Sequence, residues 1–368
     1  MSDISYFQDI PKLSIQFIEK LNQDQNFNYH PVMNSSTGIG RKINMGYNCY
    51  AVKLYKLANE WDNLNENRKL KWIKYLEDYQ QHENHEYVNY FVDPEVKKYF
   101  DKYLSIYNFK SITKGSLNLL LNKNYEEKNK HIFKTLNADS KQTISTLNEI
   151  GIKIQNSPDQ YFKDYGNVEG YLNSYDWKKP WDAGAQFSSI SLYNETFNLG
   201  LDDNLNKFIE SKLDENTGSY FDTIPDSPRQ IINGAMKVLS GLDWLNCPVH
   251  LPEKLIDFCL QNKPKFEGCD LVDYIYVLYK CSIQTDYKKK EINELLKDVL
   301  NYLKLLYKET ENGFSYYIDK SQTHYYGIKI SKGTNTADIH GTILSVWAIV
   351  MILNLLEKNT YDYKLIRP

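Results

Sequence analysis

Apolar helical segments recur along this chain, and each opens with a small cluster of polar, ionisable or glycine residues. Residues 234–242, 271–281 and 343–356 are apolar on nearly every side, which is typical of helices buried on several faces. We predict six such inner helices, which begin near Gly46, Asp139, Asp182, Arg229, Asp270 and Asp338.

Amphipathic segments lie between most of these apolar stretches. Residues 68–81 and 292–307 place apolar side chains at helical spacing on one stripe only. Such helices bury one face and leave the other in water, as an outer layer would. Residues 9–21 are expected to pair with the last inner helix and close a circle. Strand signals are sparse, and residues 327–330 are the main segment that we expect to be extended.

A second recurrence is a pair of adjacent aromatic residues followed by an aspartate. A turn glycine precedes two of the copies, which favours a short aromatic turn before an inner helix. The copies are Tyr90 to Asp93, Tyr161 to Asp164, Tyr220 to Asp222 and Tyr316 to Asp319.

The two recurrences predict an all-α fold, a closed ring of alternating inner and outer helices. No Pro/Gly/Ser linker divides the chain, so we expect one domain over residues 1–368, with an irregular insertion at 95–134. The six-hairpin alternation, with the turns G-S-Y-F-D at 218–222 and N-G-F-S-Y-Y at 312–317, resembles the α/α-toroid superfamily. That group includes terpene cyclases and protein prenyltransferases, and similarly built polysaccharide lyases and glycoside hydrolases. The resemblance implies an (α/α)6 toroid whose cleft lies at the N-terminal ends of the inner helices.

Composition narrows the class of protein. Hydrophobic residues make up 42% and charged residues 25%, with a net charge of -3, which describes a globular protein without a nucleic-acid partner. The five cysteines form no C-x-x-C pair, which favours a reducing compartment. Residues 1–22 lack the apolar core of a signal peptide, and residues 343–356 are too short to span a bilayer. We therefore expect a cytoplasmic protein without membrane insertion.

The first candidate cluster lies around the third predicted inner helix. Trp177 and Trp181 would form a stacking platform for a sugar or another flat ligand beside the helix start. Asp182 is placed to act as an acid or to cap the helix. The alternative is that both indoles belong to the core and Asp182 is only a cap.

The second cluster is the polar loop that leads into the last inner helix. His340 follows Asp338 in the first turn, where a histidine can exchange a proton near neutral pH. A packed histidine and a capping aspartate are the alternative. The same loop supplies a possible tyrosine base and three residues that would bind an anionic substrate group: Tyr326, His324, Lys329 and Lys332.

Two further candidate clusters are residues three or four positions apart on a predicted helix. Arg229 and Asn233 are four residues apart and share a face, where they would hold a carboxylate of a uronate, unless they are an exposed pair without a ligand. Asp270 and Asp273 are three residues apart and could act as acid and base. A cap and a first-turn acid that complements the helix dipole are the alternative for this pair.

The sequence lacks the motifs that identify several classes of enzyme. The chain has no phosphate loop, dinucleotide fingerprint, nucleophile elbow or H-E-x-x-H pair, and no aspartate-rich cyclase motif. Its cysteines and histidines have no recognisable zinc spacing, so we expect neither a metal nor a cofactor.

The leading hypothesis is a carbohydrate-active enzyme, a lyase or a hydrolase, that acts on an anionic oligosaccharide, polysaccharide or glycan precursor. The alternative from another class is a non-catalytic toroid that binds a glycan or a partner. An isoprenoid cyclase is the weaker third possibility. Carboxylates and His340 that share one site would favour the enzyme, and carboxylates that are each satisfied separately would favour the binding protein.

Overall fold

The computed structural model describes residues 4–23, 26–81, 87–102, 128–158 and 167–368. Helix-to-helix packing dominates these residues, and the described strands form only two small antiparallel pairs. The prediction of a predominantly helical protein is therefore confirmed. Most of the predicted insertion at 95–134 lies outside the described residues. Among the described helices, none combines the length and apolar character that a membrane span requires.

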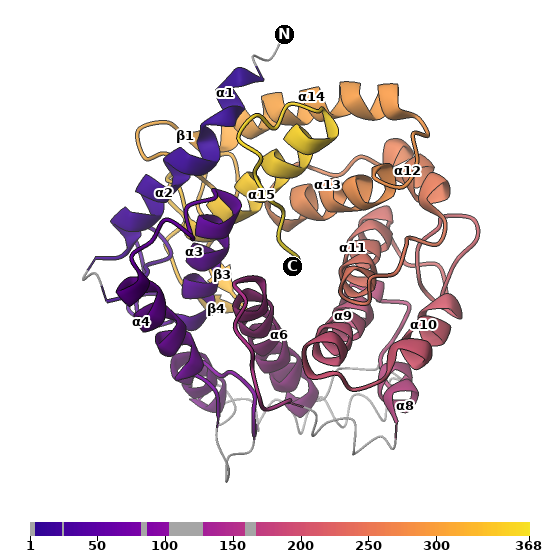
Figure 1. The fold of residues 1–368 in the computed structure, drawn as a ribbon, viewed down its shortest axis with the longest axis horizontal. Helices are drawn as coiled ribbons and strands as arrows, with labels where there is room; N and C mark the ends of the chain where they lie inside the picture. Colours follow the sequence, from indigo (N-terminus) through magenta and orange to yellow (C-terminus); the bar gives the residue numbers. More distant parts are fainter. Residues whose placement is uncertain (1–3, 24–25, 82–86, 103–127, 159–166) are drawn as a thin grey trace, which may run out of the picture.

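Six helices contact one another in cyclic order, each with the next and the last with the first. Figure 1 shows them arranged around a common axis. We call them the inner helices: α3 (Met45–Leu57), α6 (Lys128–Glu149), α9 (Pro180–Phe197), α11 (Pro228–Trp244), α13 (Gly268–Ser282) and α15 (Ile339–Leu355).

Amphipathic helices lie outside this ring (Figure 1). They are α2 (Ile10–Leu21), α4 (Glu66–Glu77), α10 (Asp202–Glu210), α12 (Pro252–Gln261) and α14 (Lys289–Leu306), with the short α1 (Ser5–Gln8) and α8 (Val168–Asn173). Most of them pack on an inner helix, as α12 does on α13 and α14 does on α15. The outer helices expected at 9–21, 68–81 and 292–307 correspond to α2, α4 and α14, and α2 contacts α15 as predicted.

The predicted starts of the inner helices agree with the structure within two residues, except at Asp139. There the prediction was wrong, because α6 begins at Lys128 and Asp139 lies well inside it. Asp139 is buried and accepts a hydrogen bond from the hydroxyl of Tyr325. Asp139 therefore lies in the interior of α6 and does not cap a helix start, and its Oδ2 atom has no hydrogen-bond partner among the described residues.

Short β-bridges join the end of an outer helix to the turn before the next inner helix. Leu213 pairs with Tyr220 after α10, and Gln80 pairs with Phe91 after α4. After α14 the same bridge is the pair of strands β1 (Tyr307–Lys308) and β2 (Gly313–Phe314). These bridges place three of the predicted aromatic turns at equivalent points of the ring, and the Tyr161 copy lies outside the described residues. The segment expected to be extended at 327–330 contains β4 (Ile328–Lys329), which pairs with β3 (His324–Tyr325).

Small residues bring α9 and α11 into close contact. A Cβ atom at Gly234 would lie 2.6 Å from the Pro180 Cβ atom, and one at Gly241 would lie 2.6 Å from the ring of Phe187. The hydroxyls of Ser188 and Ser240 are hydrogen-bonded at 2.6 Å in the same interface. Side chains on these two helices that face the ring axis are therefore held at fixed positions.

Segments close to the two ends of the chain, residues 8–9 and 361–363, lie side by side. The Tyr363 hydroxyl donates to the backbone carbonyl of Gln8 at 2.8 Å, and the Tyr361 hydroxyl donates to Asp9 at 2.7 Å. Asn59 donates to the carbonyl of Tyr361 at 3.1 Å from the end of α3. We call this junction the seam of the ring.

Candidate functional site

Asp338 stands directly before α15 and is 1% exposed. Its carboxylate accepts backbone N–H bonds from Gly341 and Tyr316 at 2.7 Å and from Gln322 at 3.0 Å. Burial raises the pKa of Asp338, and these N–H groups oppose the rise. The arrangement explains Asp338 as a helix cap that also holds the preceding loop.

The two tryptophans predicted as a platform have different environments. Trp177 is 1% exposed and donates its indole N–H to the carbonyl of Leu172 at 3.0 Å, which places it in the core. Trp181 is only half-buried, and the guanidinium carbon of Arg229 lies 5.3 Å from its ring centre. Trp181 is thus the indole that remains accessible near the N-terminal ends of the inner helices.

Asp182 lies on the exposed side of the same turn. Its side chain is 57% exposed and pairs with Lys134 of α6 at 2.8 Å. Such an exposed pair contributes little to stability and leaves the carboxylate solvated. The structure does not bring Asp182 together with Asp270 or Asp338 in one cluster.

Arg229, Asn233 and Asp270 form a compact group between α11 and α13. The Arg229 Nε atom is 2.8 Å from both carboxylate oxygens of Asp270, and the Asn233 amide donates to Asp270 Oδ1 at 2.8 Å. Arg229 and Asn233, predicted to hold a carboxylate of a substrate, hold a carboxylate of the chain itself.

Asp273 lies one turn further along α13 and is 2% exposed. Its Oδ2 atom has no hydrogen-bond partner among the described residues. Burial raises the pKa of Asp273 to about 6, although nearby Lys237 and Arg229 act in the opposite direction. A buried carboxyl group with a pKa close to neutrality is suited to proton transfer.

His340 lies against two tyrosines at the first turn of α15. Its ring stacks on Tyr50 of α3 at 4.7 Å between centres and lies 5.3 Å from the ring of Tyr316. Burial, together with Lys237, lowers the pKa of His340 to about 3, so the imidazole is neutral at pH 7. Its Nδ1 atom is buried without a hydrogen-bond partner among the described residues. Tyr326 is also half-buried in this region and is electrostatically coupled to Tyr50.

The other residues of the predicted loop lie apart from this group. His324 and Lys329 face each other across the β3–β4 pair, and both are exposed. Lys332 is exposed as well, and its backbone N–H bonds to the carbonyl of Ser35. The structure brings none of these three side chains to Asp270, Asp273 or His340.

Lysines on the inner helices are the main residues that sequence reasoning missed. Lys237 of α11 interacts electrostatically with Lys53 of α3, Lys141 of α6, Asp273 of α13 and His340 of α15. The ring neighbours of α11 are α9 and α13, so these electrostatic interactions with α3, α6 and α15 act across the ring. All three lysines are partly exposed to solvent, and the region that the six inner helices surround is called the interior below.

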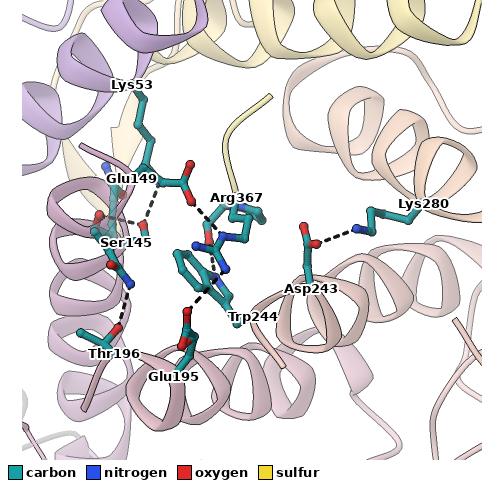
Figure 2. Close-up of polar contacts among 12 residues, drawn as sticks. Lys53, Ser145, Glu149, Glu195, Thr196, Asp243, Trp244, Lys280 and Arg367 are labelled. Atoms are coloured by element: carbon teal, nitrogen blue, oxygen red, sulfur yellow. Dashed lines mark hydrogen bonds and ion pairs between the residues drawn. The ribbon is translucent and has the colours of Figure 1, made fainter. Parts of the chain in front are cut away.

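The opposite end of the ring is occupied by the C-terminal tail. Figure 2 shows Arg367 between the last turns of α6, α9 and α11. Its guanidinium carbon lies 3.7 Å from the ring centre of Trp244, and it pairs with Glu149 at 2.9 Å and Glu195 at 4.0 Å. The Trp244 indole N–H donates to the carbonyl of Pro368 at 3.2 Å. We call this the tail plug.

No group of three or more potential metal ligands occurs among the described residues. In comparisons with known protein families, characterised proteins and solved structures, nothing matched this chain.

Proposed function

We propose that the chain is an (α/α)6 toroid enzyme that acts on an anionic oligosaccharide, polysaccharide or glycan precursor inside the ring. The cyclic contacts of the inner helices support the toroid, since each inner helix packs on the next and most have an outer partner. The accessible Trp181 supports a ligand with a flat apolar face, as sugar rings have. The lysines at the axis support a substrate with negative charge.

The observation that carries the proposal is the contrast between Asp270 and Asp273. The first is held as an ion pair by Arg229 and Asn233, and the second is buried, with an unpartnered oxygen and a raised pKa. Glycoside hydrolysis uses two carboxyl groups in such different environments, one to give a proton and one to act as an anion.

The same geometry favours hydrolysis over elimination. Elimination at a uronate would need Arg229 and Asn233 to hold the substrate carboxylate, but Asp270 already occupies both. In hydrolysis, Asp273 would protonate the leaving oxygen of the glycosidic bond. Asp270 would act as the nucleophile or as the base that activates water, because its three hydrogen bonds leave a further acceptor position on an ionised carboxylate.

A non-catalytic binding toroid is the second candidate. It is favoured by Asp182 and Asp338, which are each satisfied separately, one by Lys134 and the other by backbone N–H groups. The isoprenoid alternative has less support, because a dry aromatic pocket without charge would suit it better than an interior with three lysines.

A turnover assay tests the proposal. The full chain and the variants Asp273→Asn and Asp182→Asn would be incubated with acidic and neutral oligosaccharides, and the products identified by mass spectrometry. We expect hydrolysis of an acidic substrate, lost by about 100-fold or more in Asp273→Asn, the scale of one general acid. Asp182→Asn should keep near-normal turnover because its carboxylate is solvated and outside the cluster.

The alternatives predict different outcomes. Binding of an acidic oligosaccharide by the wild-type chain without any cleavage would favour the binding toroid. Full turnover by Asp273→Asn would overturn the assignment of the acid, and an unsaturated product would show elimination in place of hydrolysis.

A further inference from the structure

We propose that the last turns of α6, α9 and α11 form a binding site for an arginine-bearing segment of another polypeptide. Residues 364–368 of the chain itself, called the tail below, occupy this site in the structure and compete with such a segment. The inference is independent of the proposed function, because Asp270 and Asp273 lie in the first two turns of α13, whereas the tail plug lies at the C-terminal ends of the inner helices.

The site has an aromatic face and an acidic edge for a guanidinium group. The guanidinium carbon of Arg367 lies 3.7 Å from the ring centre of Trp244, and Figure 2 shows the two side chains together. The Arg367 Nε atom donates to Glu149 Oε1 at 2.9 Å. A planar guanidinium group stacks on an indole and donates from its edge at the same time, whereas the ammonium group of lysine has no plane to stack. The site therefore selects arginine over lysine.

The ring, and not the tail, positions the residues of this site. Glu149 ends α6, Glu195 lies in the last turn of α9 and Trp244 ends α11. Helix α9 packs on both α6 and α11 through contacts that do not involve the tail. The C-terminal end of a helix carries a partial negative charge, so three such ends together favour a cation. We therefore expect the site to persist when the tail is displaced.

The tail has few other attachments to the ring. Within the described part of the chain, the backbone N–H groups of residues 364–367 donate no hydrogen bond. Lys364 is exposed, so the side chains that hold the tail on the ring are those of Leu365, Ile366 and Arg367. Segments without backbone hydrogen bonds to the rest of the fold open at a low cost in free energy. This property makes the tail displaceable.

Arg367 does not use the whole site. Its Nη1 atom is 4.0 Å from Glu195 Oε1, which is longer than a hydrogen bond, and the Glu195 side chain is 36% exposed. The chain also ties this arginine to Tyr363, whose hydroxyl donates to the carbonyl of Gln8. An arginine on a separate polypeptide has no such tether and can approach both glutamates within hydrogen-bond distance. A segment from outside can therefore displace the tail, although the tail has the advantage of a high local concentration.

The tail also shows what a partner segment requires beside its arginine. Ile366 is 7% exposed, and the carbonyl of Pro368 accepts the indole N–H of Trp244 at 3.2 Å. We therefore expect an extended segment with an apolar residue before the arginine and an available backbone carbonyl on the residue after it.

Binding of a peptide in trans tests the site. A fluorescently labelled, C-terminally amidated peptide with the sequence of residues 364–368 would be titrated with the wild-type chain and with Arg367→Ala, and binding followed by fluorescence anisotropy. We expect Arg367→Ala to bind this peptide about tenfold more tightly than wild type, because its own tail no longer competes. The same peptide with Arg367→Lys should bind about tenfold more weakly, the scale of one charge-assisted contact.

Two further comparisons separate recognition from a loss of folding. Glu149→Gln in the Arg367→Ala background should weaken peptide binding about tenfold. Glu294→Gln, on the exposed face of α14, is the charge-matched control and should leave the affinity unchanged. The chain with Arg367→Lys keeps the positive charge at the tail plug, and we expect it to bind the peptide more tightly than wild type because lysine competes less well.

A purely structural role for Arg367 predicts other results. Arg367→Ala would then lower the melting temperature without creating any binding of the peptide. That outcome, or equal affinity for the arginine and lysine peptides, would overturn the site. An unchanged peptide affinity after Glu149→Gln would show that the peptide binds elsewhere and would overturn it as well.

Discussion

Asp270 and Asp273 are one turn apart on α13, and their carboxyl groups have different environments. The first is paired at 2.8 Å with Arg229, and the second is buried with a pKa of about 6. A carboxyl group whose pKa is raised by folding destabilises the folded state wherever it has to ionise. The pH dependence of stability therefore reports on Asp273 directly.

We predict that Asp273→Asn will become more stable relative to wild type as the pH rises from 4 to 7. Below pH 4, the carboxyl group is protonated in the folded and unfolded states and has no effect. Between the ordinary value of 3.8 and about 6, only the unfolded state ionises, so the wild-type protein loses stability as the pH rises. The full difference is about 3 kcal/mol for a shift of roughly two pKa units.

Urea unfolding at pH 4, 5, 6 and 7 measures this difference. Asp298→Asn, on the exposed face of α14, is the matched control and should show no pH-dependent change. The groups that face Asp273 are Lys237, Asp270 and Arg229, and none of them is altered in the variant. A constant difference between Asp273→Asn and wild type would show that Asp273 ionises normally in the folded state.

At this scale the sequence predicted residue types better than their partners. The sequence predicted that Arg229, Asn233 and Asp270 lie at the N-terminal ends of inner helices. The hydrogen bonds among them depend on the distance between α11 and α13, which no local pattern encodes. Trp177 and Trp181 are four residues apart, and only their tertiary contacts distinguish core from surface. The lysines of the interior had one signal, a single charge within an apolar stretch, as with Lys237 within residues 234–242.

At the scale of elements, the periodicity of apolar residues was sufficient to locate most inner helices. Pro180, Pro228 and Ser227 stand at helix starts where proline and a capping serine are favoured, so α9 and α11 were predictable from local chemistry. The start of α6 was not predictable in this way, because the sequence alone does not distinguish a buried aspartate such as Asp139 from an N-cap aspartate. The cyclic order of contacts also exceeds what local patterns specify, since it depends on packing between distant segments.

The contact between α9 and α11 gives a prediction at this scale. We expect Gly234→Ala to destabilise the protein by about 1–3 kcal/mol, the usual cost of overpacking, even after the gain of about 1 kcal/mol in helix propensity. The new Cβ atom would lie 2.6 Å from the Cβ atom and 3.0 Å from the backbone carbon of Pro180, which has little freedom to move.

Chemical denaturation compares this variant with Gly38→Ala, where an added Cβ atom meets nothing within 4 Å. We expect the control to unfold like the wild type. If the two variants were equally stable, α9 and α11 would be less closely packed than the structure indicates.

At the scale of the whole molecule, the tail plug covers Trp244 and Glu149 at one end of the ring. We predict that Arg367→Ala will make Lys53 react faster with an acylating reagent. Removing the guanidinium from Trp244 and Glu149 opens a route to this lysine, whose pKa of about 8 leaves part of it as the reactive neutral amine. The lost cation–π contact should lower stability by about 2 kcal/mol or less.

Peptide mass spectrometry over a time course of acylation measures the rate at Lys53. Lys364→Ala removes an exposed tail charge whose ion pair within the described part of the chain is with neighbouring Asp362, and should leave this rate unchanged. An identical rate at Lys53 in wild type and Arg367→Ala would mean that reagents reach the interior entirely from the other end.

The seam has a consequence for how the chain can be rearranged. Gln8 and Asp9 are hydrogen-bonded to Tyr363 and Tyr361, so segments more than 350 residues apart in sequence lie side by side. A linker that starts at Pro368 and is long enough to retrace the five tail residues beyond Tyr363 would join the N-terminal segment at this junction. New ends could then be opened in another surface connection, for example between α12 and α13. Such a circular permutant would keep every neighbour of every inner helix, so the order in which the hairpins are synthesised can change while their arrangement does not.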